Sequence, residues 1–272
     1  MAARPLYTAE LLFQGAQRLG LSPCWLTPGS VFAINVNGHE RYIDLSRSPL
    51  NSDVSVALAK NKYVTRHILD RHQLPNIPFV LPESQVEAEA FLDRHKTVVA
   101  KPVSGSGSRD IHIISDWQQL GRLRLKKYLL EKYIAGRELR YLILNGSIIG
   151  VQRSDYGLSV AEDRPLKRIA YYEDQWNPAI MKLTQQIAII MNLKFAAIDY
   201  LVDSFGKAYV LEVNTMPGFK WFHAPTSGPV VDVARLFLES VVEAAQAELR
   251  PAYYADFLSA PHQSLQLFGG LA

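Results

Sequence analysis

The segment FAAIDYLVDSFGKAYVLEVNTMPGF, residues 195–219, determines most of what the sequence predicts about this protein. Its two halves are rich in β-branched and aromatic residues, and they flank the turn-forming residues 204–207. This pattern is typical of a β-hairpin. We expect Asp203 to pair with Ala208 at the turn, which sets the register of both strands.

Three oxygen-bearing side chains fall on one face of this hairpin. Counting back from the turn places Asp199 opposite Glu212, and the alternation of side chains along a strand puts Asn214 on the same face. Two carboxylates at this separation repel each other. Together with an amide oxygen they suit Mg²⁺, which fills its remaining positions with phosphate oxygens and water. An exposed acidic face is the alternative, but the apolar character of both strands favours a metal site.

The composition is that of an ordinary globular protein. The chain has 272 residues, 48% hydrophobic and 20% charged, which is enough for one large domain or two small ones. No apolar run approaches the roughly 18 residues that span a membrane. The single cysteine, Cys24, fits a reducing compartment, so we expect a cytoplasmic protein. With a net charge of +3 and only short basic clusters, nothing indicates nucleic-acid binding.

Helical and strand periodicities alternate along the chain. They predict helices at residues 8–19, 54–69, 83–95, 115–127, 178–191 and 229–249, and strands at residues 31–36, 40–43, 79–81, 97–102, 111–114, 129–134, 138–144 and 147–153. Residues 154–176 have no regular pattern, and the tail after Arg250 is weakly patterned. Because several strands are joined as hairpins, we expect an α+β fold with largely antiparallel sheets.

A Gly/Ser-rich loop, residues 103–109, follows the predicted strand that carries Lys101. This loop leads into another strand, whereas a dinucleotide-binding fingerprint or a P-loop leads into a helix, which argues against both motifs. Backbone N–H groups in such a loop can hold phosphate oxygens, and the lysine adds a positive charge. A simple turn is the alternative, and the metal site predicted above favours phosphate binding.

A second hairpin is predicted around the turn Asn145–Gly146. Regular pairing from that turn places Glu138 opposite Arg153, with Arg140 on the same face. One interpretation is an exposed cross-strand salt bridge, which contributes less than about 1 kcal/mol. The other is a binding site in which the carboxylate holds hydroxyl groups and the arginines stabilise negative charge. The geometry alone leaves both interpretations open.

Five motifs in this order resemble the ATP-grasp superfamily, and the pattern is most similar to its carboxylate–amine ligases, such as D-alanine–D-alanine ligase, glutathione synthetase and cyanophycin synthetase. The motifs are AKNKYVTRHIL, VVAKPVSGSGS, LLEKYIAGRELRYLILNG, AAIDYLV and YVLEVNTMPGF. The resemblance implies an ATP-grasp fold, in which two α/β lobes clasp ATP. With this resemblance we expect a short N-terminal region (1–50) and an ATP-grasp domain (51–250, with the lobe boundary near 135). From its weak pattern we expect the tail (251–272) to be loosely ordered.

The resemblance also implies which residues bind the nucleotide. Lys62 and Lys101 would contact the phosphates, and a flexible loop would close over them. The loop residues concerned are Ser104, Gly105 and Ser106. Glu131 would take the adenine amino group, helped by the backbone of Lys132, and the N–H of Ile134 would donate to a ring nitrogen. The remaining nucleotide contact is Glu138, which would hold the ribose hydroxyls.

The same resemblance assigns the metal and catalytic residues. Two Mg²⁺ ions, which Mn²⁺ could replace, would bind Asp199, Glu212 and Asn214. Arg153 would stabilise the transferring phosphoryl group and the acyl intermediate, assisted by Arg140 and Lys101, and Gly218 would lie near the substrate carboxylate together with Arg153.

The implied reaction is ATP-dependent joining of a carboxylate to an amine through an acyl phosphate, with release of ADP and phosphate. A kinase or phosphotransferase on the same fold, and an ATP-binding module without catalysis, are the alternatives. We expect amino-acid or peptide substrates, no nucleic acid and no membrane, and either a homodimer or a partner protein. Ala197 stands where D-alanine–D-alanine ligases carry an arginine. Arg164, Lys167 and Arg168 either recognise an acidic substrate or are solvated loop charges.

Overall fold

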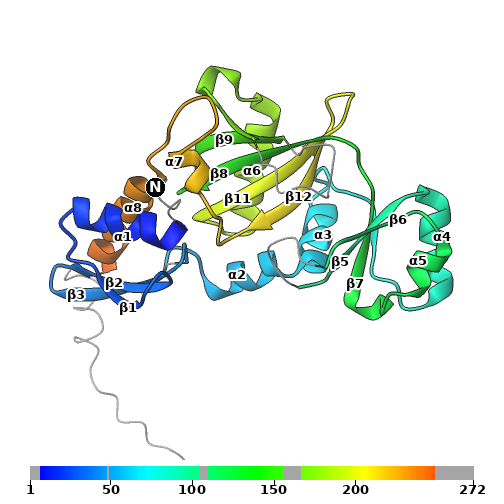
Figure 1. The fold of residues 1–272 in the computed structure, drawn as a ribbon, viewed down its shortest axis with the longest axis horizontal. Helices are drawn as coiled ribbons and strands as arrows, with labels where there is room; N and C mark the ends of the chain where they lie inside the picture. Colours follow the sequence, from blue (N-terminus) through cyan, green and yellow to red (C-terminus); the bar gives the residue numbers. More distant parts are fainter. Residues whose placement is uncertain (1–6, 48, 105–109, 156–166, 249–272) are drawn as a thin grey trace, which may run out of the picture.

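The computed structural model describes residues 7–47, 49–104, 110–155 and 167–248. The described strands form three antiparallel sheets with helices packed against them, which confirms the predicted α+β class (Figure 1). Among the described helices, none combines the length and the apolar character needed to cross a membrane.

The N-terminal region is a small layer of its own. Helix α1 (Thr8–Arg18) precedes a three-stranded sheet in the order β1 (Cys24–Thr27), β2 (Val31–Val36) and β3 (His39–Asp44). The predicted hairpin at Asn37–Gly38 is confirmed, and both residues have positive φ angles. Strand β1 was not predicted, because its four residues are too few to show a strand periodicity.

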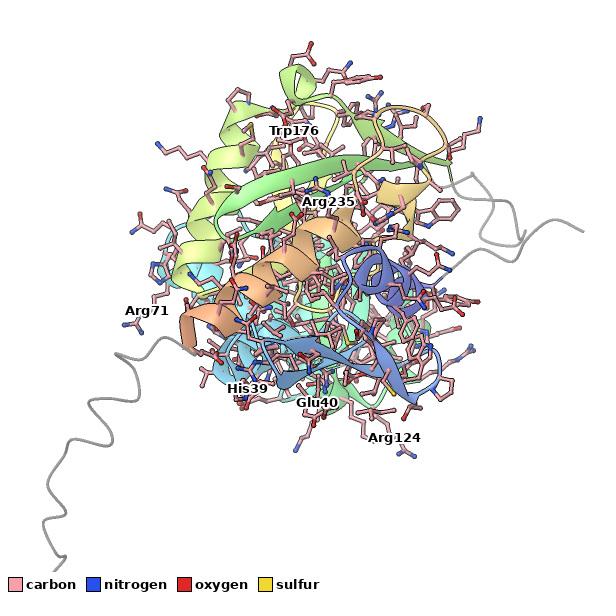
Figure 2. All side chains as sticks on the ribbon, turned by 90° about the vertical axis from the view of Figure 1, so that its left-hand side faces the viewer. His39, Glu40, Arg71, Arg124, Trp176 and Arg235 are labelled. Carbon is pink, nitrogen blue, oxygen red and sulfur yellow. The ribbon has the colours of Figure 1, made fainter. Side chains whose placement is uncertain are left out.

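This layer shares a hydrophobic core with the rest of the protein. Leu12 of α1 and Phe32 of β2 pack in one cluster with Phe195 and with Phe237 of α8 (Val233–Glu248). Figure 2 shows α8 lying beside α1, next to the three-stranded sheet. The contact is close at Gly15, where an added Cβ would lie 3.1 Å from the side chain of Leu238. The N-terminal region is therefore held by burial of large apolar side chains.

The long helix predicted at residues 54–69 is two helices, α2 (Asp53–Lys60) and α3 (Lys62–Arg71). The break falls at Asn61, whose ψ of 102° is extended and whose side chain accepts from the N–H of Val64. The hydrophobic pattern runs through this break, because an N-cap asparagine interrupts the backbone without interrupting the apolar face. The break places Lys62 at the first turn of α3.

The first large sheet has the order β4-β7-β5-β6. Its strands are β4 (Phe79–Val80), β7 (Tyr128–Lys132), β5 (Val98–Pro102) and β6 (His112–Ile114). Helices α4 (Gln85–His95) and α5 (Trp117–Gly121) cover one face, and Phe91 and Leu92 of α4 pack there on Val98 and Ala100. The predicted helix at 115–127 is shorter than expected, and Leu125–Lys127 form a 3-10 turn.

The second large sheet has the order β10-β9-β8-β11-β12. Its strands are β10 (Lys167–Tyr171), β9 (Ser147–Asp155), β8 (Arg137–Leu144), β11 (Phe195–Val202) and β12 (Ala208–Asn214). Helix α6 (Pro178–Ile190) packs on one face through residues such as Ile187, which meets Tyr141 and Ile198 in one cluster. Strand β10 lies in the stretch expected to be irregular. Its apolar alternation covers only five residues, and its pairing with β9 supplies the missing order.

The short helix α7 (Lys220–His223) and the following loop cover the other end of this sheet. Gln152 of β9 donates to the carbonyl of Trp221 at 2.6 Å, and an added Cβ on Gly150 would lie 2.7 Å from the ring of Phe222. Helix α8 begins at Val233, four residues later than Pro229, where the predicted helix starts.

Candidate active site

Asp199 and Glu212 are direct cross-strand partners, as predicted, but the register that joins them is irregular. At the turn Val202, and not Asp203, pairs with Ala208, so that expectation was wrong by one residue. A β-bulge between the pairs Tyr200–Val210 and Asp199–Glu212 adds one residue, Leu211, on β12. The one-residue shift at the turn and the one-residue insertion at the bulge offset each other, so Asp199 still pairs with Glu212.

The pairing beyond the bulge is regular, and Asn214 lies opposite Ala197. Alternation along β12 then places the side chains of Asn214 and Glu212 on one face of the sheet, as expected. The amide oxygen of Asn214 accepts from the N–H of Met216 at 2.9 Å, which fixes the orientation of this side chain. The three candidate ligands thus come from two adjacent strands.

Arg140 of β8 binds the other side of Asp199. Its Nε and Nη2 donate to the two carboxylate oxygens at 2.8 and 2.7 Å, in a bidentate pair. The Asp199 charge raises the pKa of Arg140 above its ordinary value, against the effect of burial. Arg140 also donates to the carbonyl of Gly218 at 3.4 Å, so the predicted catalytic arginine and the predicted substrate-binding glycine are in contact.

Glu212 is the uncompensated member of the pair. Within the described part of the chain, no hydrogen bond or ion pair reaches its carboxylate. Burial and the neighbouring charge of Asp199 raise the pKa of Glu212, although Lys62, Lys101 and Arg140 oppose this. A half-buried carboxylate beside a second carboxylate fits a divalent cation, because the cation would remove the repulsion and use oxygen ligands that Mg²⁺ prefers.

The two predicted phosphate-binding lysines lie near this pair. Lys62 is close enough to Glu212, Lys101 and Glu131 for their charges to affect its pKa, which burial lowers below the ordinary value. The backbone N–H of Lys62 donates to the carbonyl of Val103 at 2.9 Å. The start of α3 is therefore joined to the end of β5, and the structure brings together the lysines and carboxylates that the sequence predicted separately.

The predicted phosphate loop is only partly described. Ser104 forms an isolated antiparallel bridge with Asn61, which holds the start of the loop against the N-cap of α3. Gly105 and Ser106 lie outside the described residues. Their predicted role stays a prediction.

Glu131 has partners that the sequence did not suggest. Its Oε1 accepts from Nε of Arg66 and its Oε2 from Nζ of Lys101, both at 2.7 Å. Burial raises the pKa of this carboxyl, but the charges and hydrogen bonds of Arg66 and Lys101 outweigh burial and lower it to about 2. Both oxygens thus already accept from a cation, and the predicted contact of this carboxylate with an adenine amino group stays a prediction.

Backbone groups are better placed to bind a nucleotide base. Lys132 ends β7, and its N–H donates to the carbonyl of Pro78. Within the described part of the chain, the N–H of Ile134 donates to no protein acceptor. Ile134 lies in the linker that joins the two large sheets. In this linker an added Cβ on Gly136 would lie 2.7 Å from the carbonyl oxygen of Val202.

The predicted pairing of Glu138 with Arg153 was wrong. The turn pairs Leu144 with Ser147 as expected, but a bulge between Leu142 and Ile143 shifts the register. Beyond the bulge, Glu138 pairs with Ser154 and Arg153 pairs with Leu139. Alternation then puts Arg153 on the face opposite to Glu138 and Arg140.

Arg168 of β10 takes the place beside Glu138. It pairs with Ser154 in the sheet, and its Nη1 lies 3.8 Å from Oε1 of Glu138. Ser154 donates to the same oxygen at 3.2 Å. The side chain of Arg168 is only 14% exposed, so it is not a solvated loop charge. Lys167 is exposed, and Arg164 lies outside the described residues.

The sequence reasoning missed Arg66 as a site residue, and it left Arg168 open between substrate recognition and a solvated loop charge. Arg66 follows Lys62 by four residues, so both lie on one face of α3. That spacing was the available signal. The place of Arg168 beside Glu138 depends on the pairing of β10 with β9, which the sequence did not reveal.

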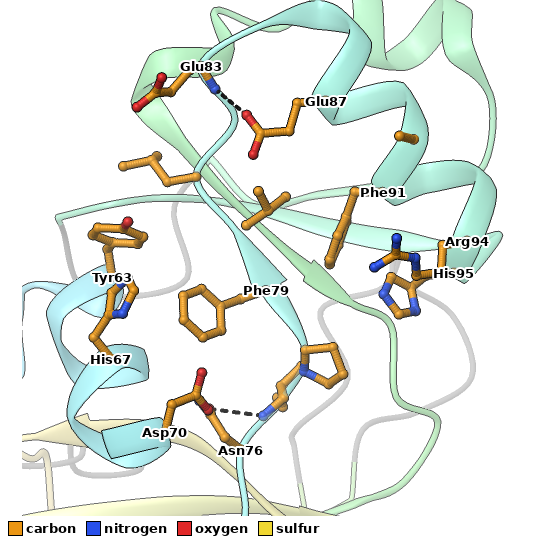
Figure 3. Close-up of a pocket in the computed structure, with 15 residues that line it drawn as sticks. Tyr63, His67, Asp70, Asn76, Phe79, Glu83, Glu87, Phe91, Arg94 and His95 are labelled. Carbon is orange, nitrogen blue, oxygen red and sulfur yellow. Dashed lines mark hydrogen bonds between the residues drawn. The ribbon is translucent and has the colours of Figure 1, made fainter. Parts of the chain in front are cut away.

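Two surface pockets lie near these residues. The larger, of about 830 Å³, lies between α3 and α4 beside β4, where Tyr63, His67, Phe79, Phe91 and Arg94 line it (Figure 3). The smaller, of about 140 Å³, lies between α2 and β12, and Glu212 and Asn214 line it together with Arg47, Lys60 and Met216. Of these two pockets, the smaller is the one that contains Glu212.

Comparison with known proteins assigns the chain to a family. The ATP-grasp domain family matches residues 59–217, which is more than half of the chain. The matched range contains Lys62, Lys101 and the Asp199–Glu212–Asn214 set. The chain belongs to the ATP-grasp family, and the predicted ATP-grasp fold is confirmed.

Individual relatives are ligases of several kinds. D-alanine–D-alanine ligase of Aquifex aeolicus is 27% identical over 138 residues, which cover 44% of this chain and 46% of the relative. Tetrahydromethanopterin:alpha-L-glutamate ligase of Methanocaldococcus jannaschii is 21% identical over 221 residues, 75% of this chain and 73% of the relative. The chain spans about half the length of the D-alanine–D-alanine ligase that it matches.

Among solved structures, the macrocyclase MdnC of Microcystis aeruginosa, bound with its precursor peptide MdnA, is similar to this chain with a TM-score of 0.63. The similarity covers 89% of this chain and 97% of the macrocyclase, at 12% sequence identity. At that identity the likeness concerns the fold, and it extends over nearly all of both chains.

Proposed function

We propose that this protein is an ATP-dependent ligase that activates a carboxylate as an acyl phosphate and joins it to an amine, with release of ADP and phosphate. The observation that carries the proposal is the meeting of Lys62 and Lys101 with the Asp199–Glu212 pair. Membership of the ATP-grasp family and the similarity to carboxylate–amine ligases support it.

Two Mg²⁺ ions, or Mn²⁺ in their place, would be held by Asp199, Glu212 and Asn214. Bound Mg²⁺ supplies positive charge that orients phosphate oxygens and neutralises them. Lys62 and Lys101 add positive charge from the side of the first large sheet. Phosphoryl transfer requires mainly alignment and charge neutralisation, which these groups can provide without covalent chemistry.

The other side of the site is a polar face on β8, β9 and β10. Arg140, Glu138 and Arg168 lie there next to Gln152 and Ser154, both of which are buried. We assign to Arg168, rather than Arg153, the role of stabilising the developing negative charge with Arg140. Preorganised cations on a buried face stabilise such charge effectively, because they do not reorganise during the reaction.

The nucleotide base would bind at the linker between the sheets, through the backbone of Lys132 and Ile134, with Glu138 near the ribose. Gly218, whose carbonyl Arg140 contacts, would lie beside the carboxylate substrate. We propose an amino acid or a peptide as that substrate. The D-alanine–D-alanine and glutamate ligases among the relatives, and the peptide-bound macrocyclase, support this class.

A hydroxylamine trap tests the reaction. The protein is incubated with ATP, Mg²⁺, hydroxylamine and a panel of amino acids and short peptides, and ADP release and hydroxamate formation are measured. A ligase that forms an acyl phosphate yields both products with its own acid. Asp199→Asn and Glu212→Gln should stop both while leaving the circular dichroism spectrum unchanged.

Two outcomes would overturn this function. ADP release with a stable phosphorylated product and no hydroxamate would indicate a kinase or phosphotransferase. Mg²⁺-dependent ATP binding without ADP release, for every substrate offered, would indicate a nucleotide-binding module.

A further inference from the structure

We propose that Arg66 is a positioning residue that sets both halves of the active site at once: it holds the β12 bulge that brings Glu212 opposite Asp199, and through Glu131 it holds Lys101. This inference rests on the proposed function, because it assigns a role within that same site. Its support is the set of contacts that one buried guanidinium makes with two strands and with a loop residue.

Arg66 is 2% exposed and uses all three of its nitrogens. Nε donates to Oε1 of Glu131 at 2.7 Å on β7. Nη1 donates to the carbonyl of Val210 at 2.5 Å and Nη2 to the carbonyl of Leu211 at 2.9 Å, both on β12. Nη1 also donates to the side chain of Asn76 at 2.9 Å. One side chain of α3 therefore connects a strand of each large sheet.

The two β12 carbonyls belong to the bulge. Val210 is the last residue of the regular pairing that starts at the turn, and Leu211 is the inserted residue. Without the insertion, the register of Tyr200–Val210 would continue to pair Asp199 with Leu211. Glu212 would then pair with Ile198 and project from the opposite face. The bulge is thus a condition for the carboxylate pair, and Arg66 binds two backbone carbonyls at the bulge.

The Nε of Arg66, bonded to Glu131, acts on the side of the site where Lys101 would bind phosphate. Glu131 is 1% exposed, and Arg66 and Lys101 occupy one oxygen each. A buried carboxylate needs this compensation, and loss of either cation would leave it underpaired. Arg66 therefore fixes the direction of Glu131, and Glu131 in turn fixes the ammonium group of Lys101 at the edge of the site.

Only arginine has the shape for this arrangement. Its planar guanidinium presents five N–H donors in fixed directions, whereas a lysine has one nitrogen at the end of a flexible stem. A lysine at position 66 could keep the ion pair with Glu131 or reach a bulge carbonyl. It could not hold Glu131, Val210 and Leu211 in the observed geometry at the same time.

The test compares four variants with the wild-type protein. Arg66→Met removes the whole contact set, Arg66→Lys keeps the charge, and Glu131→Gln removes only the arm that leads to Lys101. Arg71→Met is the control, because Arg71 lies on the same helix but is exposed. Binding of a non-hydrolysable ATP analogue is measured by calorimetry over a series of Mg²⁺ concentrations, and folding is checked by thermal melting.

We expect Arg66→Lys to bind the analogue more weakly and to need about 10-fold to 100-fold more Mg²⁺ for half-maximal binding, the usual effect of losing a group that orients metal ligands. Glu131→Gln should weaken binding while its Mg²⁺ midpoint stays near the wild-type value. Arg71→Met should match the wild type. If Arg66→Met does not fold, the comparison of Arg66→Lys with Glu131→Gln still decides.

The inference fails if Arg66→Lys binds like the wild type, or if its Mg²⁺ midpoint equals that of Glu131→Gln. That failure is distinct from a failure of the proposed function, in which the wild-type protein itself would bind no nucleotide in the presence of Mg²⁺.

Discussion

Glu212 faces Asp199 across β11 and β12 because Leu211 is inserted between the regular part of the hairpin and the pair itself. Arg140 donates two hydrogen bonds to Asp199, whereas Glu212 accepts none from the described residues. The site therefore carries an excess negative charge on one side, with Lys62 and Lys101 nearby. This imbalance leads to the first prediction.

Glu212→Gln should stabilise the ligand-free protein. Since the pKa of Glu212 is raised in the folded state, its ionised form opposes folding at neutral pH, and this cost disappears as pH falls and the carboxyl becomes protonated. The variant should melt at a higher temperature than the wild type near pH 7, with a smaller difference near pH 4. A lower melting temperature at neutral pH would contradict the predicted repulsion.

The same variant should lose its response to ligand. Mg²⁺ with ATP should raise the melting temperature of the wild type, since a ligand that binds only the folded state stabilises it, but should not raise that of Glu212→Gln. Glu173→Gln, an exposed substitution, is the control and should respond as the wild type does.

Arg140→Met should destabilise the fold by about 3 kcal/mol, because it leaves the buried Asp199 without its partner. Asp199 has a side chain only 4% exposed, so water cannot replace the arginine. Urea denaturation measures the loss. Arg137→Met on the same strand is exposed and should change stability little; equal losses in both variants would argue against the ion pair as the cause.

Glu131 should make stability depend on acid pH. Its folded-state pKa of about 2 lies below the ordinary 4.5, so its ion pairs contribute fully above that ordinary value, and the contribution is lost as pH falls towards 2. The difference in unfolding free energy between the wild type and Glu131→Gln should therefore shrink over this range. Glu243→Gln, an exposed substitution, is the control. A constant difference for Glu131→Gln would contradict the lowered pKa.

Gly228→Ala should destabilise the loop that covers β10. Gly228 has a φ of +94°, and an added Cβ would lie 1.9 Å from the carbonyl oxygen of Ala170, so the backbone must move. Gly206 has a φ of +81° but open space around it, and Gly206→Ala should cost only the roughly 1–2 kcal/mol of a left-handed residue. Chemical denaturation of both variants should give a clearly larger loss for Gly228→Ala.

The sequence predicted the carboxylate pair and the two hairpins of the site, because these depend on local patterns of alternation and turn residues. Lys62 was named from the family resemblance, and phosphate binding by Lys62 and Lys101 stays a prediction. It predicted the correct partner for Asp199 through two errors of register that cancel. In the hairpin around Asn145–Gly146, a single bulge shifts the register and no second irregularity offsets it. The predicted pairing therefore placed Arg153 on the wrong face. Turn residues fix a register only until the first bulge.

Bulges escape such reasoning because distant contacts stabilise them. The carbonyls at Leu211 are held by Arg66, which is 145 positions away in the chain. Strand β10 was missed for a similar reason, since its order comes from pairing with β9 and from the loop of residues 226–228, and not from its own five residues. The split between α2 and α3 was local, but Asn61 resembles any polar residue on the exposed side of a helix.

The shared core of α1, β2 and α8 has a practical consequence for anyone who divides this chain. A boundary drawn at residue 50 follows the family pattern, but a fragment that starts there would lose Leu12 and Phe32 and expose Phe195 and Phe237 to water. Such a fragment is expected to aggregate rather than to report on nucleotide binding, so biochemical work should keep the first fifty residues attached.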